Sequence, residues 1–142
     1  MRSLAARGEK SALPIALPKI IAYAKIFADI VMVETAGAGQ TDVEIENHVD
    51  TLIQVLPPLE GPLNMEKAGI NECAHLFAVN AREYFLNNEQ FFALAEIELG
   101  RKVDNNGWTK KVFLVNAREK KGIAEFVDCL YAHKKFLENL KR

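Results

Sequence analysis

The sequence has few cysteines, almost no net charge and no long apolar run. Cys73 and Cys129 stand singly among apolar residues without Cys-x-x-Cys spacing, which favours reduced core thiols over a metal site or a disulfide. Eighteen basic and 19 acidic residues leave a formal net charge of −1, so charge gives no argument for a nucleic-acid or membrane partner. Lys19 and Lys25 interrupt the apolar region 13–33, and no stretch approaches the roughly 20 apolar residues of a membrane span. Because the first residues also lack the apolar core of a secretory signal, we expect a cytoplasmic protein.

The composition is that of an ordinary globular domain, with 49% hydrophobic and 26% charged residues over 142 positions. A chain of this length buries about two-thirds of its unfolded surface on folding. We find no internal repeat and no low-complexity tract that would divide it. The sequence therefore predicts a single α/β domain over residues 1–142.

Short apolar runs alternate along the chain with segments of helical periodicity, and this alternation predicts a mainly parallel sheet with flanking helices. In the segments with helical periodicity, apolar residues recur every three or four positions, as on one face of a helix. We expect strands near 28–34, 52–56, 76–80 and 111–116, and helices near 18–26, 63–73, 84–99 and 123–140.

The segment 33–42 follows the first expected strand with an acidic residue and two glycines. Ligands of open α/β sheets bind outside the carboxyl ends of the strands, which is where this segment would lie. Glu34 could hold Mg²⁺ directly or through water, and Gly37 and Gly39 would let backbone N–H groups approach a phosphate. The same pattern also occurs at sheet edges that bind nothing, so the segment alone leaves both interpretations open.

Polar residues follow three of the four expected strands on what should be the same edge of the sheet: Glu34, Asn80 and Asn116. In this order and spacing, their segments resemble the third, fourth and fifth sequence elements of a GTPase. The whole chain resembles the MeaB/ArgK group of P-loop GTPases, the methylmalonyl-CoA mutase-associated chaperones of cobalamin-dependent acyl-CoA mutases, long named LAO/AO transport ATPases. The resemblance is carried by residues 2–8, 33–40, 49–51, 67–70, 79–80 and 122–123.

The resemblance covers nearly the full chain but only about half of a family member, namely the C-terminal half of the G domain. It implies a partial P-loop NTPase fold of the SIMIBI-like kind that lacks the P-loop strand. It also implies GTP and Mg²⁺ as cofactors. By this resemblance Glu34, Gly37 and Gln40 are the catalytic candidates, with Glu34 on the metal, Gly37 donating to the γ-phosphate, and Gln40 in the second switch.

The same resemblance implies that the guanine base contacts Asn80, Glu83, Asn116 and Ala117. The base-reading segment departs from the family form asparagine-lysine-x-aspartate, because Ala81 stands at the lysine position and Glu83 at the aspartate position. Asn116 stands where the family prefers serine. Losing a charge-assisted buried contact costs ~1.5–3 kcal/mol, so guanine affinity should fall roughly tenfold or more.

No Gly-x-x-x-x-Gly-Lys-Ser/Thr motif occurs in the chain, so a loop that cradles the α- and β-phosphates is missing from it. We therefore expect the isolated chain to show no GTP turnover and to bind GTP weakly or not at all. A truncated product, a split protein completed by another chain, and a domain that has lost catalysis all remain open.

Three function classes are consistent with these features. The chain is a portion of a mutase-chaperone GTPase, with a cobalamin-dependent acyl-CoA mutase or a complementary P-loop-bearing chain as partner. Alternatively, it is a non-catalytic interaction module or scaffold that binds such a mutase or GTPase half. An unrelated flavodoxin-like or cobalamin-binding module is disfavoured, since no Asp-x-His-x-x-Gly signature occurs.

The family's central strand is absent, which should leave an open place in the sheet. From the family order we expect the strands ending at Glu34 and Asn80 to pair directly, to gape, or to be bridged by another chain. Unpaired strand edges promote association, so we also expect self-association.

Overall fold

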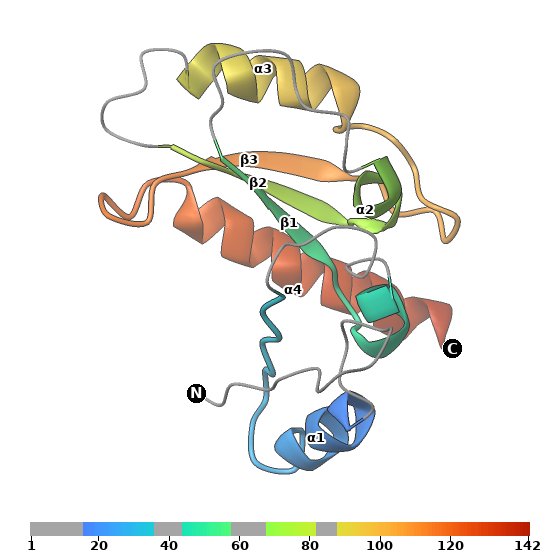
Figure 1. Cartoon of the computed structure of the whole chain (residues 1–142). Helices are drawn as coiled ribbons and strands as arrows, with labels where there is room; N and C mark the ends of the chain where they lie inside the picture. The colour runs from blue at the N-terminus through green and yellow to red at the C-terminus, as the bar shows by residue number, and fades with distance from the viewer. Residues whose placement is uncertain (1–15, 36–43, 58–67, 82–87) are drawn as a thin grey trace. The chain divides into compact units, whose positions relative to one another are not determined.

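The computed structural model describes residues 16–35, 44–57, 68–81 and 88–142 (Figure 1). The chain divides into two compact units, Met1–Val49 and Asp50–Arg142, which are described separately below. The single domain expected over residues 1–142 stays a prediction. Within the described residues, no helix is long and apolar enough to cross a membrane.

The second unit is built on a three-stranded parallel sheet of β1 (Ile53–Leu56), β2 (Leu76–Asn80) and β3 (Lys111–Val115). The strand order is β1-β2-β3, with Ile53 opposite Leu76 and Leu76 opposite Lys111. The central strand is the most apolar, because its first four residues are buried on both faces of the sheet. The structure confirms the expected α/β class and the three strands predicted near 52–56, 76–80 and 111–116.

Among its described residues, this unit has the helices α2 (Ala68–Cys73), α3 (Asn88–Glu98) and α4 (Ile123–Leu140). Figure 1 shows α3 and α4 on opposite faces of the sheet. They confirm the helices predicted near 63–73, 84–99 and 123–140 wherever these are described, while residues 63–67 and 84–87 lie outside the described residues. The unit is therefore a partial three-layer α/β fold, consistent with part of a P-loop NTPase.

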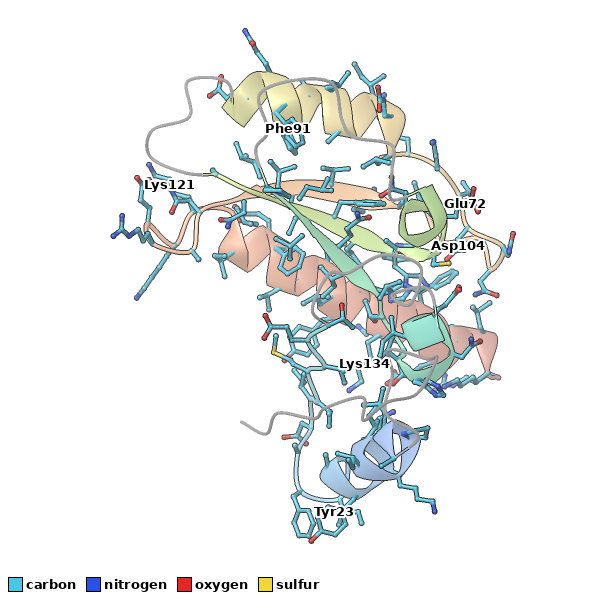
Figure 2. The ribbon with its side chains drawn as sticks, in the orientation of Figure 1. Tyr23, Glu72, Phe91, Asp104, Lys121 and Lys134 are labelled. Atoms are coloured by element: carbon cyan, nitrogen blue, oxygen red, sulfur yellow. The ribbon has the colours of Figure 1, made fainter. Side chains whose placement is uncertain are left out.

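The main core lies between α3 and the sheet. Phe91, Ala95 and Leu99 recur every four residues on one helix face, and Phe91 points from α3 toward the strands (Figure 2). They meet the residues that alternate toward this face of the sheet, because side chains along a strand point to opposite faces in turn. The buried cluster comprises Leu56, Ala74, Phe77, Val79, Phe91, Ala95, Leu99 and Val112.

The opposite face of the sheet is held to α4 by aromatic and histidine contacts. Phe113 packs edge-on against Phe126, with ring centroids 5.6 Å apart. Toward the C-terminal half of the helix, His133 is completely buried, 4.5 Å from the His75 ring and 4.7 Å from the Trp108 ring. These rings anchor α4 to the sheet at two points along its length.

The first unit contains α1 (Leu17–Ala24) and a short 3-10 helix, η2 (Glu44–His48). Proline in the first turn of α1 removes an N–H that would have no helical partner, and Leu17 and Ile21 form the buried side. The helix predicted near 18–26 is therefore confirmed.

The strand predicted near 28–34 is wrong, because residues 28–35 form neither helix nor strand. Ile30 is 62% exposed and Met32 is 90% exposed, which is incompatible with a strand buried on both faces. An apolar run becomes a strand only when a neighbouring strand pairs with its backbone groups. Within the part of the chain that the structure describes, no strand pairs with this segment.

The expected open place beside the strand that ends at Asn80 is also wrong. The strand that ends at Asn80 is β2, which has β1 on one side and β3 on the other. The edge strands among the described residues are β1 and β3, so the open place expected beside the strand that ends at Asn80 is not there.

Candidate functional site

The carboxyl-terminal edge of the sheet brings the ends of β2 and β3 together. Asn80 is the register partner of Val115, and the Ala81 N–H donates to the Val115 carbonyl at 2.8 Å. Asn116 and Ala117 follow directly after Val115. Since parallel strands end at the same edge, the structure places three of the predicted base-contacting residues, Asn80, Asn116 and Ala117, at adjacent strand exits.

The segment after β3 closes on itself through Asn116. Its side-chain Oδ1 accepts hydrogen bonds from the backbone N–H groups of Arg118 and Glu119, each at 3.1 Å. Its backbone N–H donates to the Lys121 carbonyl at 3.0 Å, and the Lys121 N–H donates back at 3.1 Å. Asparagine is well suited to this position because its short side chain can satisfy the N–H groups of a following turn. We call residues 116–121 the β3 exit loop.

Two left-handed residues, one in the β3 exit loop and one directly after it, lead the chain into α4. Lys120 has φ 57° and Gly122 has φ 68°. A Cβ atom on Gly122 would lie 2.1 Å from the Leu114 carbonyl oxygen, so only glycine fits there. Glu119 and Lys121 form an exposed ion pair at 2.5 Å, and this hydrogen bond raises the pKa of Lys121. The sequence-level match at residues 122–123 therefore coincides with a position that needs glycine.

The predicted phosphate-side residues are not assembled by the described part of the structure. Glu34 is exposed in the first unit, on a segment that is not a strand, so it does not stand at a strand end as expected. Gly37, Gln40 and Glu83 lie outside the described residues. Among the residues that are described, no group of three His, Cys, Asp or Glu side chains could hold a metal ion.

The family model described as "Methylmalonyl Co-A mutase-associated GTPase MeaB" matches residues 1–142. The chain belongs to the MeaB family. This agrees with the adjacent strand exits, since the family segments that the sequence resembles after β2 and β3 are the ones that the fold brings together.

Three relatives are similar to this chain over all or most of its length. The "Putative GTPase" of Pyrococcus abyssi is 31% identical over 100% of this chain and 45% of its own length. The "Fused isobutyryl-CoA mutase" of Cupriavidus metallidurans is 36% identical over 68% of this chain and 10% of its own length. The mitochondrial "Methylmalonic aciduria type A homolog" of Mus musculus is 31% identical over 72% of this chain and 26% of its own length. The chain thus spans less than half the length of these relatives.

Sequence reasoning missed a buried lysine that joins two segments of this MeaB unit. Lys110 is 5% exposed, and its Nζ donates to the carbonyl oxygens of Asn71, at 2.9 Å, and Glu72. These carbonyls end α2, where a cation also interacts favourably with the helix dipole. Burial lowers the pKa of Lys110, with Asp104 acting in the opposite direction. In the sequence Lys110 is one of two adjacent lysines, and nothing local distinguishes it from Lys111.

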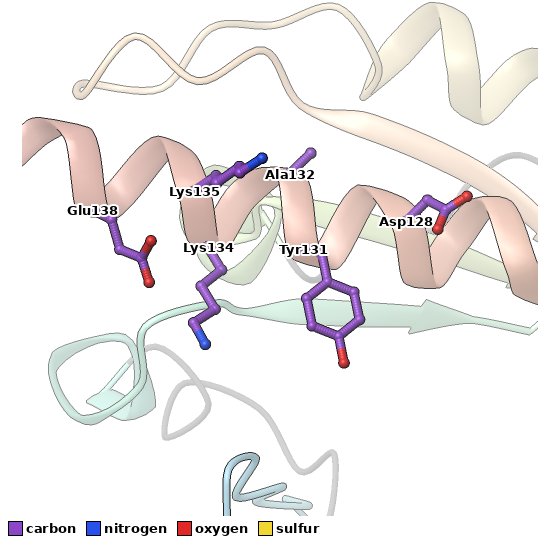
Figure 3. A pocket seen from close by; sticks show the side chains of 6 residues that line it. All are labelled: Asp128, Tyr131, Ala132, Lys134, Lys135 and Glu138. Carbon is purple, nitrogen blue, oxygen red and sulfur yellow. The ribbon is translucent and has the colours of Figure 1, made fainter.

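A hollow of about 540 Å³ lies along α4, and its described lining is shown in Figure 3. The lining residues that are described come from the solvent-facing side of the helix, and Asn80, Asn116 and Ala117 are not among them. The described lining residues are Asp128, Tyr131, Ala132, Lys134, Lys135 and Glu138. The nucleotide candidates at the strand exits are therefore separate from this hollow.

Proposed function

We propose that this chain is the base-reading portion of a GTPase that serves cobalamin-dependent acyl-CoA mutases as a chaperone. The observation that carries the proposal is the adjacency of the β2 and β3 exits, which sets Asn80 beside the β3 exit loop. Membership of the MeaB family supports it, as does the relative named as a fused isobutyryl-CoA mutase. The full reaction is hydrolysis of GTP to GDP and phosphate.

Different residues would bind the guanine base and the phosphate-bound Mg²⁺. Ala117 is exposed and offers a backbone N–H, which fits a base carbonyl as acceptor. For Mg²⁺, Glu34 is the described candidate ligand, and Mg²⁺ commonly takes one or two carboxylates and completes its shell with substrate phosphates. Glu34 therefore fits a nucleotide-bound Mg²⁺ better than a site made by protein ligands alone. Gly37, Gln40 and Glu83 keep their proposed roles toward phosphate and guanine.

Calorimetry with GTP and Mg²⁺ on the isolated chain tests this proposal. Because the chain has no P-loop motif and Ala81 replaces the base-covering lysine, we expect no turnover and a dissociation constant weaker than micromolar. Adding a chain that carries a P-loop and the first switch should restore hydrolysis. Restored hydrolysis should then fall in Glu34→Ala, while Glu44→Ala provides a control carboxylate from the same unit.

A micromolar, guanine-selective dissociation constant for the isolated chain, lost in Glu34→Ala, would contradict the proposal that tight GTP binding needs a second chain with a P-loop. Failure of every complementary P-loop chain to restore hydrolysis would favour the second candidate, a non-catalytic interaction module.

One structural feature favours the second candidate specifically. β1 is an edge strand among the described residues, and Val55 on it is 61% exposed although its register partner Ala78 is 5% exposed. Gln54, on the other face of the strand, is 5% exposed, and its Oε1 has no hydrogen-bond partner within the described residues. An edge strand of this kind, next to a buried oxygen without a partner among the described residues, suits the addition of a strand from a partner, such as a mutase or a complementary GTPase half.

A further inference from the structure

We infer that His75 and His133 form a proton-sensitive clasp, which holds the start of β1 in the sheet at neutral pH and releases it in acid. His75 directly precedes β2 and contacts His133 of α4, with ring centroids 4.5 Å apart. The clasp therefore lies at the amino-terminal edge of the sheet. Asn80 and Asn116 lie at the opposite edge, so the clasp is a separate feature from the candidate nucleotide site.

Each histidine contacts one of the two residues that lead into β1. Nδ1 of His75 accepts the backbone N–H of Leu52 at 3.0 Å, and Nδ1 of His133 lies 2.8 Å from the Oγ1 of Thr51. The backbone N–H of His75 donates in turn to the Leu52 carbonyl oxygen at 2.9 Å. The two imidazoles thus join residues 51–52 to the start of β2 and to α4.

The hydrogen bond from Leu52 fixes where the proton of neutral His75 lies. Because a backbone N–H can only donate, Nδ1 must carry the lone pair, and the proton of the neutral ring is then on Nε2. Nε2 faces Asp104, whose Oδ2 is 3.8 Å away. A second proton would have to go to Nδ1, where it would remove the acceptor of the Leu52 N–H. A protonated His75 is therefore incompatible with the present position of Leu52.

His133 disfavours a proton for a different reason. It is completely buried, and its Nε2 has no hydrogen-bond partner among the described residues. A charged ring would place an N–H at that position without an acceptor among them. Burial and the neighbouring His75 lower the pKa of His133, while Asp104 and Asp50 act in the opposite direction. The closed clasp therefore favours neutral His133.

Asp104 is the carboxylate that acts on both rings, and it is already engaged elsewhere. Its Oδ1 accepts the N–H groups of Asn106 and Trp108, at 2.9 and 2.8 Å, and the carboxylate also attracts the buried Lys110. These interactions hold Asp104 in place and limit how far it can follow a second positive charge. Two protonated imidazoles with centroids 4.5 Å apart would also repel each other.

An open clasp takes up protons that the closed clasp does not. Once released into water, His133 regains its ordinary pKa near 6.5, so the open form becomes more favourable as the pH falls below this value. β1 is an edge strand among the described residues, with β2 as its partner. The start of β1 can therefore leave while the pairing of β2 with β3 persists.

Amide hydrogen exchange of the full 142-residue chain, followed by NMR at pH 7 and pH 5, tests the clasp. We expect the protection factor of the Leu52 amide to fall roughly tenfold or more over this range, because opening is coupled to proton uptake. Low concentrations of urea separate partial opening from global unfolding, since the urea dependence scales with the surface exposed. At pH 5 the Leu52 amide should show a weak urea dependence and the β3 amides a steep one.

Variants of the histidines identify the groups that take up the protons. His75→Asn offers an amide oxygen to the Leu52 N–H and does not titrate, so the fall in Leu52 protection should shrink. In the double variant His75→Asn, His133→Phe the fall should vanish. His48→Asn is the matched control, because His48 is the remaining histidine of the chain and belongs to the first unit. It should keep the full pH dependence.

Three results would overturn the clasp. One is a Leu52 amide that keeps its protection from pH 7 to pH 5. Another is equal protection and an equally steep urea dependence for the Leu52 and β3 amides at pH 5, because β1 would then open only with the whole unit. The third is a double variant as acid-sensitive as the unsubstituted chain, or an equal effect of His48→Asn, which would assign the proton uptake to other groups.

Discussion

At the residue scale, His133 is a side chain that can take up a proton and is nevertheless completely buried. It is fully buried against His75, Trp108 and Phe136, and its Nδ1 lies 2.8 Å from the Thr51 Oγ1. Its Nε2 has no hydrogen-bond partner among the described residues. Burial, assisted by repulsion from His75 and opposed by Asp104 and Asp50, lowers the pKa of His133 to about 4. The native state therefore holds this imidazole neutral.

The buried neutral imidazole of His133 should make the folded protein less stable in acid. In the unfolded chain His133 titrates near its ordinary pKa of 6.5, so between pH 6.5 and 4 the unfolded state binds a proton that the folded state does not. The free energy of unfolding should thus fall with decreasing pH, by at most about 1.4 kcal/mol per pH unit from this group. Urea denaturation at several pH values should show a shallower dependence for His133→Phe.

Phe136→Leu is the matched control for this measurement, since it alters the packing around His133 but keeps the titrating group. It should lower stability at every pH and leave the pH dependence as it is. A pH dependence in His133→Phe as steep as in the unsubstituted chain would assign the acid sensitivity to other groups.

At the scale of elements, the junction between β3 and α4 depends on one residue. Gly122 combines φ 68° with a Cβ position only 2.1 Å from the Leu114 carbonyl oxygen. Gly122→Ala therefore requires both a left-handed alanine and a backbone shift. We expect it to destabilise the chain by roughly 2–4 kcal/mol, measured by urea denaturation.

Gly107 offers a control with the same backbone property and no clash. It has φ 88°, and nothing lies within 4 Å of the Cβ that alanine would add. Gly107→Ala should thus cost about 1 kcal/mol, the left-handed strain alone. Equal costs at the two positions would show that the junction relaxes and that the contact with β3 does not restrict it.

Much at this scale could be predicted from the sequence, because the deciding patterns are local. The buried run of β2 and the four-residue spacing of Phe91, Ala95 and Leu99 are visible in the sequence and were predicted correctly. The run at 28–34 looks the same locally, yet it is not a strand, because pairing depends on a neighbour that no local pattern reveals. For the site, the adjacency of Asn80 and Asn116 followed from the parallel order, but the closed β3 exit loop did not.

At the scale of the whole molecule, exposed apolar side chains and β1, an edge strand among the described residues, favour association. Val55 is exposed on that edge strand, and a charged side chain on an edge strand opposes edge-to-edge pairing. We expect light scattering to show concentration-dependent self-association that Val55→Lys reduces. Ile97→Lys, at a 79% exposed position on α3, adds the same charge away from the edge and should leave association unchanged.

Two results would contradict this expectation. A stable monomer across a wide range of concentrations would show that the β1 edge is protected in solution. An equal effect of Val55→Lys and Ile97→Lys would point to general charge repulsion, because the edge strand would then have no particular role.

The sequence by itself determined the family, the α/β class, the parallel sheet and, where they are described, the helices near 18–26, 63–73, 84–99 and 123–140, because periodicity and short motifs act within a few residues of one another. Only the tertiary structure decided that residues 28–35 are not a strand, that β2 is flanked on both sides, and that Asn116 closes its own loop. It also decided the burial of Lys110 and His133, whose partners lie 38 and 82 residues away along the chain. Contacts over such separations depend on how the elements pack, and identical local sequence is compatible with either outcome.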